Sequence, residues 1–439
     1  MRERYPGIDF TGIDFGTSNC TAGWLEQDVP YLLPLDGESH YLSSALFIER
    51  TRDDDSDSDE PYLNESLHRL LARGAPVALG QSAHQKYSSN PLAGIFIRSP
   101  KSMLGSRLTP AQTQIYQQVC QLLLGHIHRQ VQARRPELRY AVLGRPVHFQ
   151  GIDGAAGDER AEAILRQAAK NIGFADIQFA YEPVAAAIEF ERSLQQEQLA
   201  LVVDIGGGTT DISLIRLGPK RQPLQDRSAD VLSHAGRRIG GVDMDIKFAI
   251  YGLMPLLGRG SLGKNGRPLP NALFSDAVNI IDIQAQENFY QAATAQAIQQ
   301  LIDAAATPHI VQRLQRLYQA HLSYYLVQSA EHAKIAFASS PAAELSLDRL
   351  EAGLNQQLTQ VQFEQAIYVE LHGMRQLITQ TLSDAGAVPD CIFLTGGASA
   401  ATGVQQLLQT LLPTVPVVHG DRFGSVGKGL CSIAAQLFR

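Results

Sequence analysis

Two short turns in the sequence carry the residue types that could hold a phosphate chain. The first covers residues 14–19 (DFGTSN) and the second covers residues 204–211 (DIGGGTTD), and each follows a short apolar stretch typical of a buried β-strand. A tight turn of glycine, threonine and serine exposes consecutive backbone N–H groups, which can bind phosphate oxygens without a charged side chain. Two such turns facing each other would clamp a polyphosphate.

Each turn begins with an aspartate, Asp14 in the first and Asp204 in the second. Two carboxylates beside a triphosphate would repel it unless a divalent cation lay between them, and Mg²⁺ held by carboxylates, water and phosphate oxygens is the usual solution. Either turn alone could be an ordinary β-turn. The matched pair of aspartates instead predicts a site for Mg²⁺ and a polyphosphate.

The two turns belong to a repeated pattern. A strand, an aspartate, a glycine turn and a returning strand occur twice, and Asp204 comes 190 residues after Asp14. A repeat at an interval of about one domain indicates two related halves that open with the same hairpin.

Alternating strands and helices provide the frame for these turns and predict an α/β fold. The two hairpins would pair residues 7–14 with 21–25 and residues 199–203 with 212–217. Further strands are expected at residues 140–143 and 392–394, and helices at residues 109–135, 158–172, from 182 onward, 282–337 with a break near 307–308, and 429–438.

The composition limits the classes of function. The 439 residues carry a net charge of −7, but six acidic residues lie within residues 53–60, so the rest of the chain is nearly neutral and does not fit a nucleic-acid binder driven by bulk charge. We expect the acidic stretch to be an exposed loop. No apolar run approaches the roughly 20 residues of a membrane-spanning helix, the N-terminus does not read as a signal peptide, and the cysteines are scattered. A cytoplasmic protein with no nucleic-acid or membrane partner is therefore expected.

Two other glycine patterns match nucleotide motifs by letters alone. Residues 258–263 (GRGSLG) match the dinucleotide fingerprint, and residues 258–265 nearly match a P-loop, but asparagine follows the lysine where a P-loop needs serine or threonine. No helix follows either, so we expect a surface loop. His126 and His128 lie two positions apart on a helix, where their side chains diverge, and are not expected to bind a metal.

Taken together, these motifs resemble the nucleotide-binding part of the heat-shock 70 chaperones, the DnaK-like ATPases, and in particular their truncated YegD-like branch, within the actin, hexokinase and heat-shock ATPase superfamily. The resemblance covers nearly the whole chain. Its motifs are two phosphate loops at 12–19 and 204–211, a glutamate that opens a helix at 181–187, a glycine pair at 240–243, an adenosine loop at 395–399 and a ribose-side segment at 421–427. Lys101 stands where the family keeps its catalytic lysine, and Arg145-Pro146 where it keeps an interlobe proline.

The resemblance implies a set of site residues. Those at the reacting end are Lys101, Glu182, Asp204 and Thr209, and Lys101 with Glu182 would place the attacking water. Asp14 and Asp204 would hold the hydrated Mg²⁺. The nucleotide would be bound by Asp14, Gly16, Thr17, Ser18, Asn19, Gly206, Gly207, Gly208, Thr209, Gly240, Gly241, Glu331, Lys334, Gly396, Gly397, Ala398, Ser399 and Asp421.

The resemblance also implies an actin-like fold of two lobes, each with a mixed sheet and helices, and with ATP or ADP in the cleft between the lobes. Lobe I would cover residues 1–195 and lobe II residues 196–424, with a helical subdomain at about 245–338, and a C-terminal helix at 425–439 would return to lobe I. The implied reaction is a slow, Mg²⁺-dependent hydrolysis of ATP to ADP and phosphate.

The sequence departs from the family pattern in two places. The family places a glutamate, a lysine, an arginine and a serine along its adenine-pocket helix; Glu331 and Lys334 match, but Ile335 and Ala338 stand at the last two positions, so weaker nucleotide binding or looser base specificity is expected. The chain ends where the family's peptide-binding domain would begin, so a chaperone-like ATPase without peptide binding is expected. An ATP-controlled filament or scaffold protein and a metabolite kinase of the same superfamily are the alternatives, and no protein partner can be named.

Overall fold

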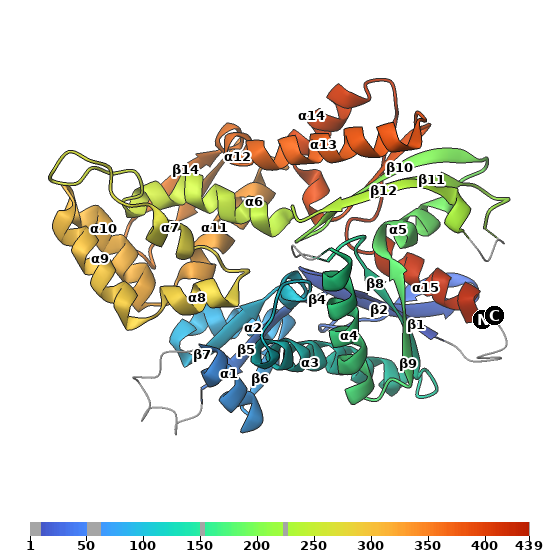
Figure 1. Ribbon diagram of the computed structural model, residues 1–439, viewed down its shortest axis with the longest axis horizontal. Coiled ribbons are helices and arrows are strands. Elements are labelled where there is room, and N and C mark those ends of the chain that lie inside the picture. Colours follow the sequence, from blue (N-terminus) through green and yellow to red (C-terminus); the bar gives the residue numbers. More distant parts are fainter. Residues whose placement is uncertain (1–9, 51–62, 150–153, 223–226, 439) are drawn as a thin grey trace.

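The computed structural model describes residues 10–50, 63–149, 154–222 and 227–438, and it has a mixed α/β architecture (Figure 1). The acidic stretch at residues 53–60, which we expected to be an exposed loop, lies outside these ranges. Residues 7–9 of the first expected strand lie outside them too.

The first sheet carries the turn at residues 14–19. It is built from β1 (Phe10–Phe15), β2 (Asn19–Glu26), β3 (Val29–Leu32), β4 (Leu42–Ser43), β8 (Tyr140–Arg145) and β9 (Asp176–Tyr181). β1 and β2 form the expected antiparallel hairpin, and β1 also pairs in parallel with β8. The spatial order is β3-β2-β1-β8-β9, with β4 beside β2.

The second sheet carries the turn at residues 204–211. It is built from β10 (Gln198–Ile205), β11 (Thr210–Leu217), β12 (Val231–Arg237), β15 (Cys391–Thr395) and β16 (Val417–His419) in the order β12-β11-β10-β15-β16. β10 pairs antiparallel with β11 and in parallel with β15, as β1 does with β2 and β8. The repeat in the sequence is therefore a repeat of the sheet topology.

Helix α5 (Glu182–Glu191) lies between the two sheets, beside α15 (Ser425–Phe438) (Figure 1). Ala185 and Ile188 pack in the cluster that includes Val142 of the first sheet, whereas Ala187 and Phe190 pack against the second. A helix that is apolar on two sides is held by both neighbours. This packing fixes Glu182, the first residue of α5, where the sheets meet.

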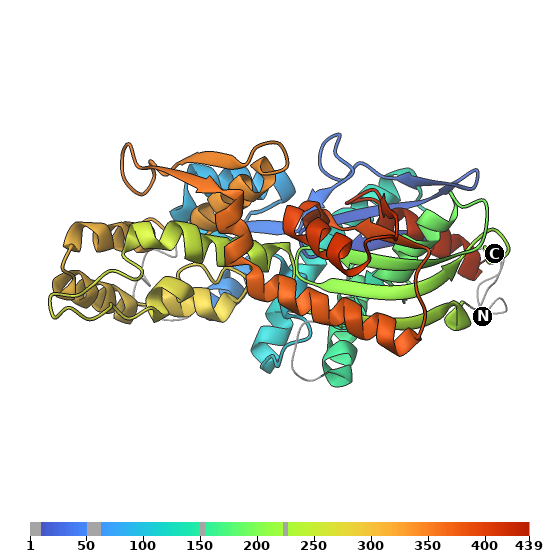
Figure 2. The ribbon, with the colours of Figure 1, turned by 90° about the horizontal axis from the view of Figure 1, so that it is seen from above.

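Other helices cover the outer faces of the sheets. α3 (Pro110–Arg134) and α4 (Ala155–Asn171) pack against the first sheet, close to the ranges expected from the sequence. α13 (Tyr368–Ala385) and α14 (Thr402–Leu411) pack against the second sheet, and α13 crosses it as a long helix (Figure 2). The central strands of each sheet are thereby buried on both faces.

A small sheet in the order β6-β5-β7 lies beside the first sheet. It comprises β5 (Ala45–Glu49), β6 (Val77–Leu79) and β7 (Gly94–Arg98), with α1 (Leu63–Ala72) and α2 (Gly80–Ser89) next to it. β7 runs into a 3₁₀ turn, Pro100–Met103, which contains Lys101.

A mainly helical part follows β12. Its elements are α6 (Gly241–Phe248), α7 (Ala272–Asp276), α8 (Ile283–Phe289), α9 (Ala292–Ala304), α10 (Pro308–Gln319), α11 (Ser323–Ala336), the hairpin of β13 (Ala342–Ser346) and β14 (Asn355–Thr359), and α12 (Gln360–Ala366). The expected helical tract at residues 282–337 is broken near residue 308, where Pro308 starts α10, but it is also broken before α9 and before α11. The last break is at His321, whose φ of 52° is left-handed and cannot continue a helix.

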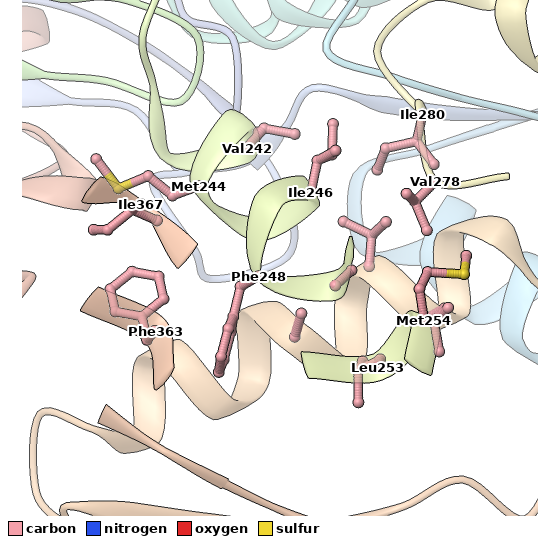
Figure 3. Close-up of a cluster of buried hydrophobic side chains, with 14 of the residues drawn as sticks. Val242, Met244, Ile246, Phe248, Leu253, Met254, Val278, Ile280, Phe363 and Ile367 are labelled. Carbon is pink, nitrogen blue, oxygen red and sulfur yellow. The ribbon is translucent and has the colours of Figure 1, made fainter. Parts of the chain in front are cut away.

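The side chains of α6 anchor this helical part to its surroundings (Figure 3). Met244 and Phe248 lie toward Ile367 and Phe363 on one side, and Ile246 lies toward Val278 and Ile280 on the other. Because α6 begins at the Gly240-Gly241 pair, its packing fixes that pair in space.

Several smaller expectations can be compared with the structure. Residues 258–265 form turns with no helix, as expected of a surface loop. His126 binds the carbonyl of Leu35 and His128 packs on Phe174, so both have structural partners. Each cysteine is buried without a disulfide. None of the helices in the described ranges has the length and hydropathy needed to cross a membrane.

Candidate functional site

The two glycine turns lie directly against each other, Ser18 of the first against Gly207 of the second. A Cβ atom added to Gly207 in the second turn would lie 2.0 Å from Ser18 Oγ and 3.3 Å from the Ser18 nitrogen in the first. A Cβ on Gly240 would lie 2.3 Å from both the Gly207 oxygen and the Gly208 nitrogen. Glycine is therefore required for three segments of the chain to approach this closely.

The segment after β15 lies against the same turns. Gly396 has a φ of 85°, and a Cβ there would lie 2.6 Å from Asp204 Oδ1. Gly241 faces Ala398, since a Cβ on Gly241 would lie 3.1 Å from the Ala398 Cβ. The structure thus brings together the turns at 14–19, 204–211, 240–241 and 396–399.

Lys101 lies in this region as a buried residue with a buried partner. It is 5% exposed, and its ammonium forms an ion pair with Glu182 at the start of α5. The 3₁₀ turn that carries it is set by Ser99, whose φ of 59° is left-handed and whose N–H donates to the Ser44 carbonyl at 2.9 Å. Lys101 is therefore not an exposed loop lysine.

The carboxylates around Lys101 have pKa values above their usual range. Burial, followed by the charge of Glu182, raises the pKa of Asp14 to about 7. The same two causes raise the pKa of Asp211 to about 7 and that of Asp204 well above its usual value. Lys101 lowers the pKa of all three, but not enough to cancel the burial. When these carboxylates are ionised, Lys101 does not neutralise all of their charge, and a bound cation would favour the ionised forms.

The donor set fits Mg²⁺ bound together with a polyphosphate. Within the residues that the structure describes, no three His, Cys, Asp or Glu side chains lie close enough to hold a metal ion by themselves. Mg²⁺ commonly takes only one or two carboxylates and completes its shell with water and phosphate oxygens. Asp204, which is buried, and Asp14, which is half-buried, lie beside the glycine turns with raised pKa values and suit that mode of binding.

We expect the Asp14→Asn variant to melt at a temperature a few degrees higher than the wild type at about pH 8, without Mg²⁺ or nucleotide, and at a temperature higher by a smaller margin at about pH 5. The pKa of Asp14 is about 7 in the folded chain against an ordinary value of 3.8, so folding takes up a proton between these values. Stability therefore falls as the pH rises through this window, and asparagine removes the loss. Differential scanning calorimetry at both pH values tests this. A lower melting temperature of the variant at pH 8 would contradict it.

Comparisons with known proteins agree with this arrangement. The family model "MreB/Mbl protein" matches residues 112–222, from α3 through the second glycine turn. The Chaperone protein DnaK of Thermus thermophilus is 25% identical over 66% of the chain and 38% of its own length. The Chaperone protein DnaK of Deinococcus radiodurans is 25% identical over 63% of the chain and 35% of its own length, and the dnaK3 chaperone of Thermosynechococcus vestitus is 27% identical over 66% and 36%.

The chain is a member of the actin, hexokinase and heat-shock 70 ATPase superfamily. Its mixed α/β architecture and its duplicated hairpin sheets are those of the actin-like fold. The matched segments span less than two fifths of the length of these DnaK relatives.

Two residues that the superfamily resemblance assigns to the nucleoside are engaged in ion pairs with other side chains. Glu331 accepts two hydrogen bonds from Arg98, and Lys334 lies 2.6 Å from Asp245 and 3.5 Å from the Gly241 carbonyl. Ile335, at the departing position, is 60% exposed. The nucleoside end of this superfamily member therefore offers fewer free polar groups than the motif alone suggests.

The remaining assigned residues lie in or next to the turns. Asp421 accepts a hydrogen bond from the Gly424 N–H at 3.0 Å and pairs with Lys428. Burial alone would raise its pKa, but Lys428 and the N–H groups of Gly424 and Phe423 together lower it. Asn19 is the first residue of β2 and pairs with Ser43. Ser399 Oγ donates to the Gly396 carbonyl at 2.7 Å, and Thr17, Gly16 and Gly206 lie within the two turns.

Asp211 joins the site although the sequence motifs gave it no role. It is 1% exposed, hydrogen-bonds to Thr209, and accepts from the Val147 N–H at 3.0 Å. Val147 follows Arg145-Pro146, the segment where the superfamily resemblance places an interlobe proline. The aspartate that closes the second turn was the available signal, because the first turn has none at that position.

Proposed function

We propose that this chain binds ATP with Mg²⁺ between its two glycine turns and slowly hydrolyses it to ADP and phosphate. The observation that carries the proposal is the meeting of Ser18 and Gly207 beside the charged group of Lys101, Glu182, Asp14 and Asp204. Superfamily membership supports it.

The phosphates would be held by the turns. Backbone N–H groups near Gly16 and from Gly206 to Gly208, with the hydroxyls of Thr17, Ser18 and Thr209, provide donors for the β- and γ-phosphates. Asp14 and Asp204 would hold Mg²⁺ through its water shell. When bound, Mg²⁺ supplies charge neutralisation for the phosphate oxygens.

Lys101 and Glu182 would act at the reacting end. Burial alone would lower the pKa of Lys101, but Glu182 and Asp14 outweigh it and raise the pKa, so the ammonium stays charged at neutral pH. A charged lysine cannot accept a proton, so its role is to orient the attacking water and to stabilise charge that shifts in the transition state. Glu182 fixes the direction of the ammonium through the ion pair.

The nucleoside would lie beyond the phosphates. Gly240, Gly241, Lys334 and the segment 396–399 surround that end, with Glu331 and Asp421 nearby as assigned from the resemblance. This arrangement supports a division into lobe I (1–195), lobe II (196–424) and a returning C-terminal helix, with the cleft between the lobes as the nucleotide site.

The proposal extends to a chaperone-like role for this ATPase. The relatives are named chaperone proteins, and we propose a chaperone-like, cytoplasmic ATPase with a protein partner and no nucleic-acid or membrane partner. The second candidate is an ATP-controlled filament or scaffold protein of the same superfamily.

Phosphate release by the purified chain tests the function. We expect slow release from ATP that requires Mg²⁺ and is not accelerated by candidate sugars. Faster phosphate transfer in the presence of a sugar would support a metabolite kinase instead. Light scattering that grows with protein concentration and ATP would support the filament.

We expect the Gly240→Ala variant to bind ATP about tenfold or more weakly. The new methyl group would meet the Gly207 oxygen and the Gly208 nitrogen at 2.3 Å, so the second turn must shift and misdirect its N–H donors. Loss of one hydrogen bond to a charged group accounts for that factor. Calorimetric titration measures it, with Gly125→Ala on α3 as the control because its nearest neighbours lie 3.7 Å away. Equal affinities of the two variants would contradict the role of the turn.

A further inference from the structure

Ser44 lies where the chain crosses from the first sheet to the small sheet, between β4 and β5. The residue is completely buried, and its N–H, its carbonyl and its hydroxyl each form a hydrogen bond. Buried polar groups normally have such partners. What distinguishes Ser44 is that its partners belong to two different parts of the candidate site.

Two of these hydrogen bonds hold the first glycine turn. The Ser44 hydroxyl donates to the Gly16 carbonyl at 2.7 Å, and the Ser44 N–H donates to the Ser18 carbonyl at 2.9 Å. A peptide group is planar and trans, so the Thr17 N–H points the opposite way from the Gly16 carbonyl that shares its plane. Ser44 therefore fixes the direction of an N–H group in the turn that would hold the phosphates.

The third hydrogen bond holds the turn that carries Lys101. The Ser44 carbonyl accepts from the Ser99 N–H at 2.9 Å, at the end of the ladder between β5 and β7. The Ser99 carbonyl in turn accepts from the Ser102 N–H at 3.0 Å, which closes the 3₁₀ turn around Lys101. Ser44 alone thus joins the phosphate turn to the lysine turn.

The Cys20 thiol adds a hydrogen bond to the Ser44 hydroxyl. Its sulfur lies 3.3 Å from Ser44 Oγ. A serine hydroxyl has one hydrogen, and Ser44 gives it to Gly16, so the thiol is the donor in this contact. Burial raises the pKa of Cys20 to about 12, so the thiol keeps its hydrogen at neutral pH. The bonds from Cys20 to Ser44 and from Ser44 to Gly16 run in one direction, and each polarises the other.

The contact through Ser44 bears on the chemical step more than on binding. The phosphates would be held by many donors in two turns, so a small shift of one turn removes only part of the affinity. The reaction also needs the Lys101 ammonium at a fixed distance from the reacting atoms, and a displacement on the order of 1 Å can slow it strongly. Glu182 fixes the direction of the ammonium, whereas Ser44 fixes the lysine turn relative to the phosphate turn.

We propose that Ser44 is a positioning residue, whose hydroxyl holds the first phosphate turn in place relative to the Lys101 turn and thereby sets the rate of the chemical step. This inference rests on the proposed function. Ser44 acts through Gly16 and Lys101 and does not touch the reacting atoms.

The test combines single-turnover ATP hydrolysis with nucleotide titration of Ser44→Ala, which removes only the hydroxyl. We expect hydrolysis to slow by about tenfold, the scale for one lost hydrogen bond, and affinity to fall by less than about threefold. Hydrolysis within about twofold of the wild type, or a loss of affinity as large as the loss of rate, would overturn the proposal.

A double-variant cycle with Lys101 separates positioning from a general weakening of the structure. If Ser44 acts through Lys101, Ser44→Ala should change hydrolysis by less than about twofold in a Lys101→Ala background, because the group that it positions has gone. A general loss of structure would lower the rate by the same factor in both backgrounds, and that result would overturn the proposal.

Thr11→Val is the matched control. Thr11 lies on β1 of the first sheet, is completely buried, and donates its hydroxyl to the Gly23 carbonyl at 2.9 Å, outside the turn. Valine keeps the shape of threonine and removes this hydrogen bond. We expect Thr11→Val to hydrolyse ATP within about twofold of the wild type. A loss equal to that in Ser44→Ala would overturn the proposal, because any buried hydroxyl in this sheet would then have the same effect.

Hydrogen exchange distinguishes a failure of this contact from a failure of the proposed function. The amide at position 44 donates to Ser18, so it should exchange faster in Ser44→Ala than in the wild type even without nucleotide. Unchanged exchange there in a folded variant would show that the hydroxyl does not hold the turn, and would overturn this inference alone. A wild-type chain that binds no nucleotide would remove the proposed function, and the control of rate by Ser44 with it.

Discussion

Replacement of Lys101 by alanine is expected to slow single-turnover ATP hydrolysis by about 10²-fold or more, the scale for one preorganised electrostatic group. The ammonium is buried, held by Glu182 and kept charged, so it is directed at one place in the site. Its effect is largest where charge shifts in the transition state. Nucleotide affinity should change far less, because the donors of the two turns remain.

Single-turnover hydrolysis and nucleotide titration of the same Lys101→Ala preparation measure the two effects separately. Lys86→Ala is the matched control, since Lys86 also pairs with a glutamate but is half exposed and lies outside the site. Turnover within severalfold of the wild type would exclude Lys101 as the group proposed. A parallel collapse of affinity and turnover would instead indicate a general role in binding.

Replacement of Asp204 by asparagine is expected to weaken Mg²⁺-dependent ATP binding by about 10- to 100-fold, the range for residues that hold a metal ion through its inner ligands. Asp204 begins the second turn and is buried beside Gly396, where only a glycine backbone fits. Asparagine keeps its shape but removes the charge that attracts the cation. Binding of ATP in the absence of Mg²⁺ should not be weakened, because a carboxylate that repels the phosphates has been removed.

Titration with ATP, once in Mg²⁺ and once in a chelator, measures how strongly the ATP affinity of each variant depends on Mg²⁺. Asp303→Asn serves as the control, because Asp303 is an exposed carboxylate on α9 that accepts a hydrogen bond from Gln299. If the ratio of the two affinities were the same in Asp204→Asn as in the wild type, Asp204 would have no part in holding Mg²⁺.

The elements that carry Asp14 and Asp204 were predictable because their signals are local. An apolar strand that runs into a glycine turn and returns as a second strand needs no distant contact to be recognised. Its repetition after 190 residues predicted two related halves, and the paired sheets of β1 and β10 confirm it. The start of α5 at Glu182 was also predictable from a local signal, because Pro183 favours the first turn of a helix.

The partners of Glu331 were not predictable from the sequence. Arg98 lies 233 residues away, and the pairing of two long charged side chains leaves no pattern in either segment. His321 breaks the helical tract before α11 with a left-handed φ but without the glycine or proline that usually marks such a break. Both features depend on tertiary packing between the small sheet and α11, which no local signal records.

Calorimetric titration of the wild-type chain with ATP, in Mg²⁺ and in a chelator, tests the central claim most directly. If the two glycine turns and their aspartates form a Mg²⁺-nucleotide site, ATP will bind saturably with one site per chain, and removal of Mg²⁺ will weaken binding markedly. Absence of saturable binding in Mg²⁺ by a folded chain, or an affinity indifferent to Mg²⁺, would contradict it.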